Sequence, residues 1–246
     1  YSSSVKQISI PIPSIDTQTD LVKILDDLVD QKQLLLDRKS GIERQMGYYF
    51  ETQIKKNDVE KFESIEKICS INKNSITKKD NYDKINYLDL TSVDKGNITK
   101  IQEIEYDKRP SRAQRKVNIG DVLIGTTRPN LKNHTIITSE NYCDNLIVST
   151  GFCVLTPNDK LLSKYLYYCI MSDILTEKMM NLATGGSYPS LNIESVKKLI
   201  IPSYSIVTQT QIVEYLDKLE GKKNNICEEI NAIDVLMKDV ITQSYS

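Results

Sequence analysis

The sequence predicts an α+β protein in which a globular domain of mixed helices and strands is flanked by two long helices. Three observations lead to this fold class. Residues 5–28 recur at 196–219, hydrophobic residues follow each copy at a spacing of seven, and residues 55–195 hold short β-branched segments separated by turns. A chain of 246 residues is long enough to bury the core that such an architecture needs.

The internal duplication is the clearest feature of the chain. Residues 5–28 and 196–219 align without a gap at an offset of 191, and 13 of the 24 aligned positions are identical. Two unrelated helix starts would share a capping residue and some leucines, but not the run Ser-Ile-x-Thr-Gln-Thr. Each copy holds an apolar run that ends at a proline, then candidate N-caps, then the start of a periodic helix.

Both periodic segments have the heptad spacing of coiled-coil helices. The seam positions are Leu21, Leu28, Leu35 and Ile42 in the first segment and Ile212, Leu219, Ile226, Ile233 and Val240 in the second, with Leu25 and Leu216 opening a companion row. Heptads sustained over roughly 30 residues favour a coiled coil, with each helix roughly 45–55 Å long. Lysines in the companion row leave open an alternative, two amphipathic helices packed on a globular body.

The block between the helices alternates short apolar segments with turn signals. We expect strands at 84–90, 117–125, 135–137 and 146–155, a helix at 163–182, and a helix or helical turn at 59–69. Glycines at 185 and 186 end the longer helix. These elements predict an α+β domain of about 140 residues.

Charge is distributed unevenly along the chain. The formal net charge is −1, but seven basic residues and one acid lie between Lys108 and Lys132, a local charge of +6. Four of the six arginines fall in this window, although lysine is the usual base elsewhere. Arginine suits planar, bidentate contact with phosphate or guanine, so the window favours nucleic-acid contact over a merely solvated loop.

Composition and motifs exclude several kinds of chemistry. The single histidine, His134, rules out a multi-histidine zinc site and is expected to lie on the surface or in a turn. Five scattered cysteines without a CxxC pair indicate reduced thiols in a cytoplasmic protein. No apolar run approaches the ~18 residues of a membrane span, and no phosphate-binding glycine loop, methyl-transfer motif or nuclease acid cluster is present. We therefore expect no metal site and no catalytic activity.

Several motifs occur in a fixed order along the chain. They are Gly120-Asp121-Val122-Leu123-Ile124 followed by 126–131, and Gly185-Gly186-Ser187 followed by 196–202 and Gln209-x-x-Ile212. Ile10-Pro11 and Gln18-x-x-Leu21 carry the same signature in the first copy of the repeat. In this order, together with the duplication, the chain resembles the specificity subunit of type I restriction–modification systems over essentially its whole length.

The resemblance implies conserved spacer helices that form an antiparallel coiled coil beside a target-recognition domain. The implied segments are residues 1–14, the last strand of a preceding recognition domain; 15–54, a spacer helix; 55–205, the recognition domain; and 206–246, the second spacer helix. The usual subunit has two recognition domains, and this chain has one. It is therefore either a fragment or truncated subunit, or a half-subunit that dimerises to restore two domains.

The resemblance also implies a DNA-recognition role within a larger complex. The expected partners are double-stranded DNA, methyltransferase subunits and restriction subunits; S-adenosylmethionine and ATP are expected on those subunits only, and no cofactor on this chain. The expected DNA contacts are Arg109, Arg112, Arg115, Lys116, Thr126, Thr127, Arg128, Asn130, Lys132, Gly186, Ser187, Tyr188 and Ser190. The seam residues are expected to form the coiled coil and partner interface. A coiled-coil adaptor that binds another protein and no DNA is the alternative function.

Overall fold

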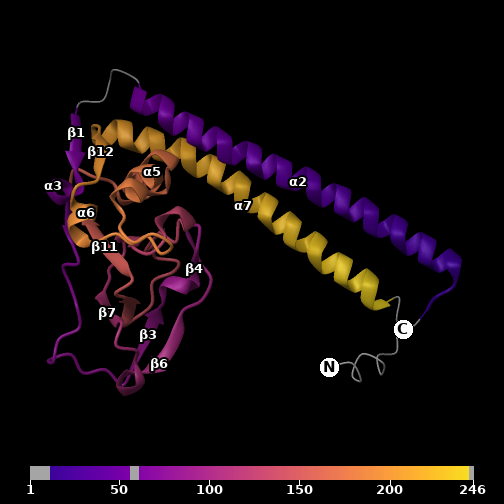
Figure 1. Ribbon diagram of the computed structural model, residues 1–246, viewed down its shortest axis with the longest axis horizontal. Coiled ribbons are helices and arrows are strands. Elements are labelled where there is room, and N and C mark those ends of the chain that lie inside the picture. The colour runs from indigo at the N-terminus through magenta and orange to yellow at the C-terminus, as the bar shows by residue number, and fades with distance from the viewer. Residues whose placement is uncertain (1–11, 56–60, 244–246) are drawn as a thin grey trace. The chain divides into compact units, whose positions relative to one another are not determined.

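The computed structural model describes residues 12–55 and 61–243 (Figure 1). The chain divides into two compact units: unit 1 combines the residues up to Met46 with those from Asp217 onward, and unit 2 is Gly47–Leu216. Two long helices, α2 (Ile15–Lys55) and α7 (Ile206–Gln243), each contribute to both units. No helix in the described ranges is long and apolar enough to cross a membrane.

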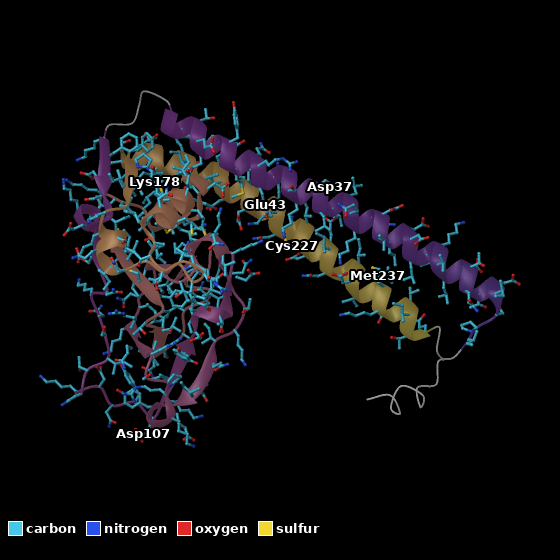
Figure 2. All side chains as sticks on the ribbon, viewed as in Figure 1. Asp37, Glu43, Asp107, Lys178, Cys227 and Met237 are labelled. Carbon is cyan, nitrogen blue, oxygen red and sulfur yellow. The ribbon has the colours of Figure 1, made fainter. Side chains whose placement is uncertain are left out.

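The helices α2 and α7 pair in antiparallel directions. In unit 1 Lys32 forms an ion pair with Asp234, and in unit 2 the rings of Tyr49 and Tyr215 lie 4.0 Å apart, so residue numbers rise along one helix as they fall along the other. Leu35 is buried against the second helix in a cluster that also holds Ile226, Ile230, Ile42 and Ile233. Figure 2 shows the side chains along both helices. The expected α+β fold with an antiparallel coiled coil is confirmed.

The duplication seen in the sequence is also present in the hydrogen bonds at the two helix starts. Ser14 and Ser205 cap their helices, each accepting a bond from the N–H three residues later at 3.2 and 3.3 Å. Gln18 and Gln209 each donate from Nε2 to the carbonyl five residues earlier, at 2.8 and 2.9 Å. The expected terminal strand within residues 1–14 falls largely on residues 1–11, which lie outside the described ranges.

Unit 2 is built on two four-stranded sheets. The first has the strand order β6 (Gln102–Glu105), β3 (Lys84–Leu88), β10 (Leu146–Ser149), β7 (Ala113–Lys116); the second has the order β2 (Cys69–Ile71), β11 (Phe152–Pro157), β8 (Val122–Gly125), β9 (Thr135–Ile136). Only β3 and β10 pair in parallel among these strands. Two short pairs are β1 (Lys61–Ser64) with β12 (Ile200–Ser203) and β4 (Val93–Asp94) with β5 (Asn97–Ile98).

Side chains from both large sheets share the main core of unit 2. Leu88 and Val148 of the first sheet lie in one buried cluster with Leu123 and Phe152 of the second. Ile147, between two residues of that cluster, instead joins a smaller cluster that holds other residues of the first sheet. Successive side chains of a strand point to opposite faces, so β10 contributes to a buried cluster on each face of its sheet. This packing on both faces holds β10, and the turn that follows it, in place.

Short helices complete unit 2. They are α3 (Ile65–Ile68), α4 (Ser163–Met171), α5 (Asp173–Leu182) and α6 (Ile193–Lys197), with the 3₁₀ helices η1 (Leu90–Ser92), η2 (Tyr106–Lys108) and η3 (Pro129–Leu131).

Two expected elements differ from those observed. The strand expected at 146–155 is two strands of different sheets, because the chain turns at Thr150 and Gly151. The helix expected at 163–182 is broken at Ser172, whose Oγ accepts a hydrogen bond from the N–H of Leu175 at 3.3 Å and so caps α5. The helix or helical turn expected at 59–69 is present as the single turn α3, between β1 and β2, and residues 59 and 60 lie outside the described ranges.

Candidate nucleic-acid interface

The two loops that the sequence singles out meet in unit 2. Thr127, which follows β8, forms an antiparallel bridge with Ser190, and the N–H of Arg128 donates to the carbonyl of Pro189 at 2.8 Å. Residues about sixty positions apart in the sequence therefore share one surface. The exposed members of the predicted set in these loops are Arg128, Asn130, Gly186, Ser187 and Tyr188.

Arg128 and Tyr188 form a stacked pair on this surface. The guanidinium carbon of Arg128 lies 3.9 Å from the centroid of the Tyr188 ring, which is 62% exposed. The backbone of Arg128 is left-handed, with φ 50° and ψ 64°, a conformation that costs a residue other than glycine roughly 1–2 kcal/mol. Strain of this kind persists where the surrounding structure enforces it, typically in ligand sites. The stack therefore holds a planar cation at the surface of unit 2.

Two further arginines adjoin this surface through the turn between β10 and β11. The carbonyl of Arg112 accepts a hydrogen bond from the N–H of Thr150 at 2.8 Å. The carbonyl of Gly151 accepts from both the N–H and the hydroxyl of Thr126, each at 2.9 Å. Arg115 and Thr126 line the same cleft of about 340 Å³. The structure thus brings Arg112, Arg115 and the Arg128 loop together.

Arg109 belongs to a different part of unit 2. Its guanidinium carbon lies 3.8 Å from the ring centroid of Tyr106, and its Nη1 donates to the carbonyl of the same residue at 2.7 Å. Asp107 marks this helix η2 in Figure 2, at the end of unit 2 away from β1 and β12. Arg109 is therefore a less direct candidate for the Arg128 surface.

The two predicted lysines are each paired with an acid. Lys116 forms an ion pair with Asp80, and this bond holds the pKa of the Asp80 carboxyl well below its usual range. Nζ of Lys132 lies 2.6 Å from Oδ1 of Asp173. Both acids lie outside the window of residues 108–132, so the local charge of +6 overstates the free positive charge. None of the four arginines in that window forms an ion pair with a residue in the described ranges. Of these four arginines, Arg112 and Arg128 are exposed.

His134 and Asp121 have structural roles beneath the loop. His134 is fully buried, and its Nδ1 accepts a hydrogen bond from the N–H of Gly125 at 3.0 Å. The expectation of a surface position is wrong because the residue is buried in the connection between η3 and β9, and this burial lowers the pKa of His134 to about 4. Asp121 accepts bonds from Thr156 Oγ1 at 2.6 Å and the Asn118 N–H at 2.8 Å, while burial raises its pKa. Both residues fix the ends of β8.

Comparison with known proteins identifies the fold family. The family model described as type I restriction modification DNA specificity domain matches residues 56–233, well over half of the chain. The chain belongs to this family. The chain is similar to two specificity subunits. One belongs to the type I restriction enzyme HindI from Haemophilus influenzae, and the other to the type I restriction enzyme MjaIX from Methanocaldococcus jannaschii. The HindI subunit is 30% identical over 116 residues, which are 46% of this chain and 25% of that subunit. The MjaIX subunit is 32% identical over 91 residues, which are 35% of this chain and 21% of that subunit.

Solved structures give the same family. The HsdS subunit from Thermoanaerobacter tengcongensis matches with a TM-score of 0.58 and 28% identity, over 68% of this chain and 43% of that one. A structure of complex assembly and conformational transition in the type I R-M system matches with a TM-score of 0.61 and 26% identity, over 75% and 48%. The specificity-domain chain thus spans less than half the length of these relatives.

Proposed function

We propose that this chain recognises a DNA sequence for a type I restriction–modification complex and has no catalytic activity of its own. The observation that carries the proposal is the Arg128–Tyr188 stack, an exposed cation held in place in a member of the DNA specificity domain family. The alternative, an adaptor that binds only proteins, gives no reason for a strained, exposed arginine beside Arg112 and Arg115, which form no ion pair with a described residue.

Recognition divides between base reading and phosphate contact. Arg128, stacked and planar, and the exposed Asn130 present the groups that bind guanine and adenine edges in the major groove. We assign contact with the phosphate backbone to Arg112, which is exposed and whose carbonyl binds the turn at Thr150; such a contact fixes register without carrying sequence information. The hydroxyls of Ser187 and Ser190 add neutral donors from the facing loop.

The coiled coil supplies the surface for the catalytic partners. Val29 and Leu36 on α2, seven residues apart, are exposed, as are Val235 and Leu236 on α7. All four lie in unit 1, outside the buried cluster around Leu35. Exposed apolar groups at heptad spacing, as at Val29 and Leu36, mark a surface that another helix covers. We assign it to the methyltransferase subunit, which also carries S-adenosylmethionine, while restriction subunits and ATP join through the assembled complex.

Two measurements test this function. The chain is co-expressed with a methyltransferase subunit of a type I system, and binding to a library of duplex DNA is followed by fluorescence anisotropy at several salt concentrations. We expect sequence-selective affinity that falls steeply with salt, because phosphate contacts release counterions. We also expect methyl transfer from labelled S-adenosylmethionine only when the partner is present. Salt-independent behaviour, or methyl transfer by this chain alone, would contradict the proposal.

A further inference from the structure

Residues 126–134, which we call the recognition loop, connect β8 with β9 and carry Arg128. Within this loop η3 lies between two residues with left-handed backbones, Arg128 with φ 50° and Lys132 with φ 54°. Two local hydrogen bonds close the turn, from the N–H of Leu131 to the carbonyl of Arg128 at 2.9 Å and from the N–H of Lys132 to the carbonyl of Pro129 at 3.0 Å. Left-handed conformations are unfavourable for residues other than glycine, so the loop keeps this shape through support from outside the turn.

His134 joins the two ends of the recognition loop from beneath. It is the only histidine in the sequence, and its side chain is fully buried. Its Nδ1 accepts a hydrogen bond from the N–H of Gly125, the last residue of β8, at 3.0 Å. A β-carbon at Gly125 would lie 2.4 Å from the carbonyl oxygen of Asn133, so the two ends of the loop approach more closely than another residue at 125 would allow. The imidazole therefore fixes where the loop begins relative to where it returns.

The imidazole also lies next to the turn that follows Arg128. Burial, which has the largest effect, and the charge of Lys132 lower the pKa of His134, while the carbonyl of Pro129 raises it. Pro129 is the first residue of η3, and Lys132 directly follows this helix. A single buried side chain thus adjoins both the strand before the recognition loop and the turn within it.

We propose that His134 is a positioning residue for DNA recognition, which joins the ends of the recognition loop and so holds Arg128 in its stack with Tyr188. The N–H of Arg128 donates to the carbonyl of Pro189 at 2.8 Å, so the stack depends on where the loop places the backbone of residue 128. This inference rests on the proposed function, because the position of Arg128 matters for recognition only if Arg128 contacts DNA.

Two substitutions of similar shape isolate the hydrogen-bond acceptor. Asparagine places its Oδ1 near the position of the imidazole Nδ1, whereas leucine has the same branching and no acceptor. We expect His134→Asn to keep the affinity for specific DNA within about twofold. We expect His134→Leu to weaken it about tenfold, because the buried N–H of Gly125 loses its partner and the loop changes shape. The affinity for unrelated DNA depends on phosphate contacts and should change little in both variants.

Fluorescence anisotropy of the chain with its methyltransferase partner measures both affinities. One duplex has the sequence that the DNA library selects, and the other has a scrambled sequence. Ile85→Val, in the smaller core cluster of unit 2, controls for a general loss of stability and should leave the ratio of the two affinities unchanged. Thermal unfolding checks that each variant is folded at the assay temperature. If His134→Leu does not fold, His134→Gln replaces it with the same expectation, because its amide lies beyond the Nδ1 position. Equal weakening by His134→Asn and the variant without the acceptor would overturn the proposal.

A double substitution tests whether His134 acts through Arg128. His134→Leu combined with Arg128→Ala should bind specific DNA no more than about twofold more weakly than Arg128→Ala alone, because two residues that serve one contact are not additive. Full additivity would overturn the positioning role and leave the proposed function intact. The same holds if Arg128→Ala weakens binding while folded His134→Leu binds as the parent does. Parental binding by Arg128→Ala itself would contradict both the recognition role of Arg128 and the positioning role of His134.

Discussion

Arg128 combines three properties that no single sequence pattern predicts: a left-handed backbone, an exposed guanidinium, and a stacking partner from a distant loop. The sequence placed Arg128 and Tyr188 in separate candidate loops because arginine enrichment and a glycine pair are local signals. Their stacking depends on the bridge between Thr127 and Ser190, which only the folded sheet creates. In the same way, the acids that pair with Lys116 and Lys132 come from outside the basic window.

The first prediction concerns the stacked pair. Arg128→Ala should weaken binding to the specific DNA site by about 1–3 kcal/mol and relax selectivity at one base position. Tyr188→Phe should bind almost as the parent does, because it keeps the ring, whereas Tyr188→Ala should lose part of the affinity. Anisotropy titrations measure both. Arg38→Ala, an exposed arginine on α2, is the control, and equal affinities for the Arg128 and Arg38 variants would remove Arg128 from the interface.

The second prediction concerns pH. The pKa of buried His134 is lowered from 6.5 to about 4, so the unfolded chain binds a proton between these values while the folded chain does not. Stability from this residue is therefore complete above pH 6.5 and is lost as the pH falls toward 4, by up to roughly 3 kcal/mol. Urea unfolding from pH 7 to 4 should show this slope in the parent chain. His134→Asn should reduce it, and an unchanged slope would assign the effect to other groups.

At the scale of elements, hydrophobic periodicity was the reliable signal. The heptad positions around Leu35 and Ile226 form the observed cluster between α2 and α7, because a repeat of seven keeps one face of a helix toward its partner. The apolar run at 146–155 predicts a single strand, which is wrong. It holds two consecutive strands of different sheets, and the turn between them is too short to interrupt the apolar pattern. The break at Ser172 was missed because apolar spacing continues across it, although serine is a good N-cap.

The third prediction tests the seam with two neighbouring leucines. Leu35 is 7% exposed and packs in the cluster between the helices, whereas Leu34 is 61% exposed. Leu35→Ala should destabilise the coiled coil by about 2–5 kcal/mol, because it removes buried methyl groups and leaves a cavity. Leu34→Ala should change stability by about 0.5 kcal/mol or less. Thermal unfolding followed by circular dichroism compares the two, and similar losses for both would argue against the seam.

At the scale of the whole molecule, the duplication predicts more of the architecture than the composition does. The net charge of −1 gave no sign of a nucleic-acid partner, because acids elsewhere in the chain balance the arginine-rich window. The repeat at an offset of 191 predicted two equivalent helix starts, and the structure shows equivalent capping at Ser14 and Ser205. Among the described residues Gln209 is buried and Gln18 is only partly buried, a difference that the sequence does not predict because it arises from tertiary packing.

Exchange of the globular domain tests DNA recognition by this chain most directly. Residues 61–203 are replaced by the corresponding domain of the HindI specificity subunit, both helices are kept, and the chain is expressed with the same methyltransferase partner. Methylated sites are then read by sequencing. The proposed function predicts that the methylated sequence changes with the domain while methylation itself persists. An unchanged methylated sequence would show that the recognition residues lie elsewhere.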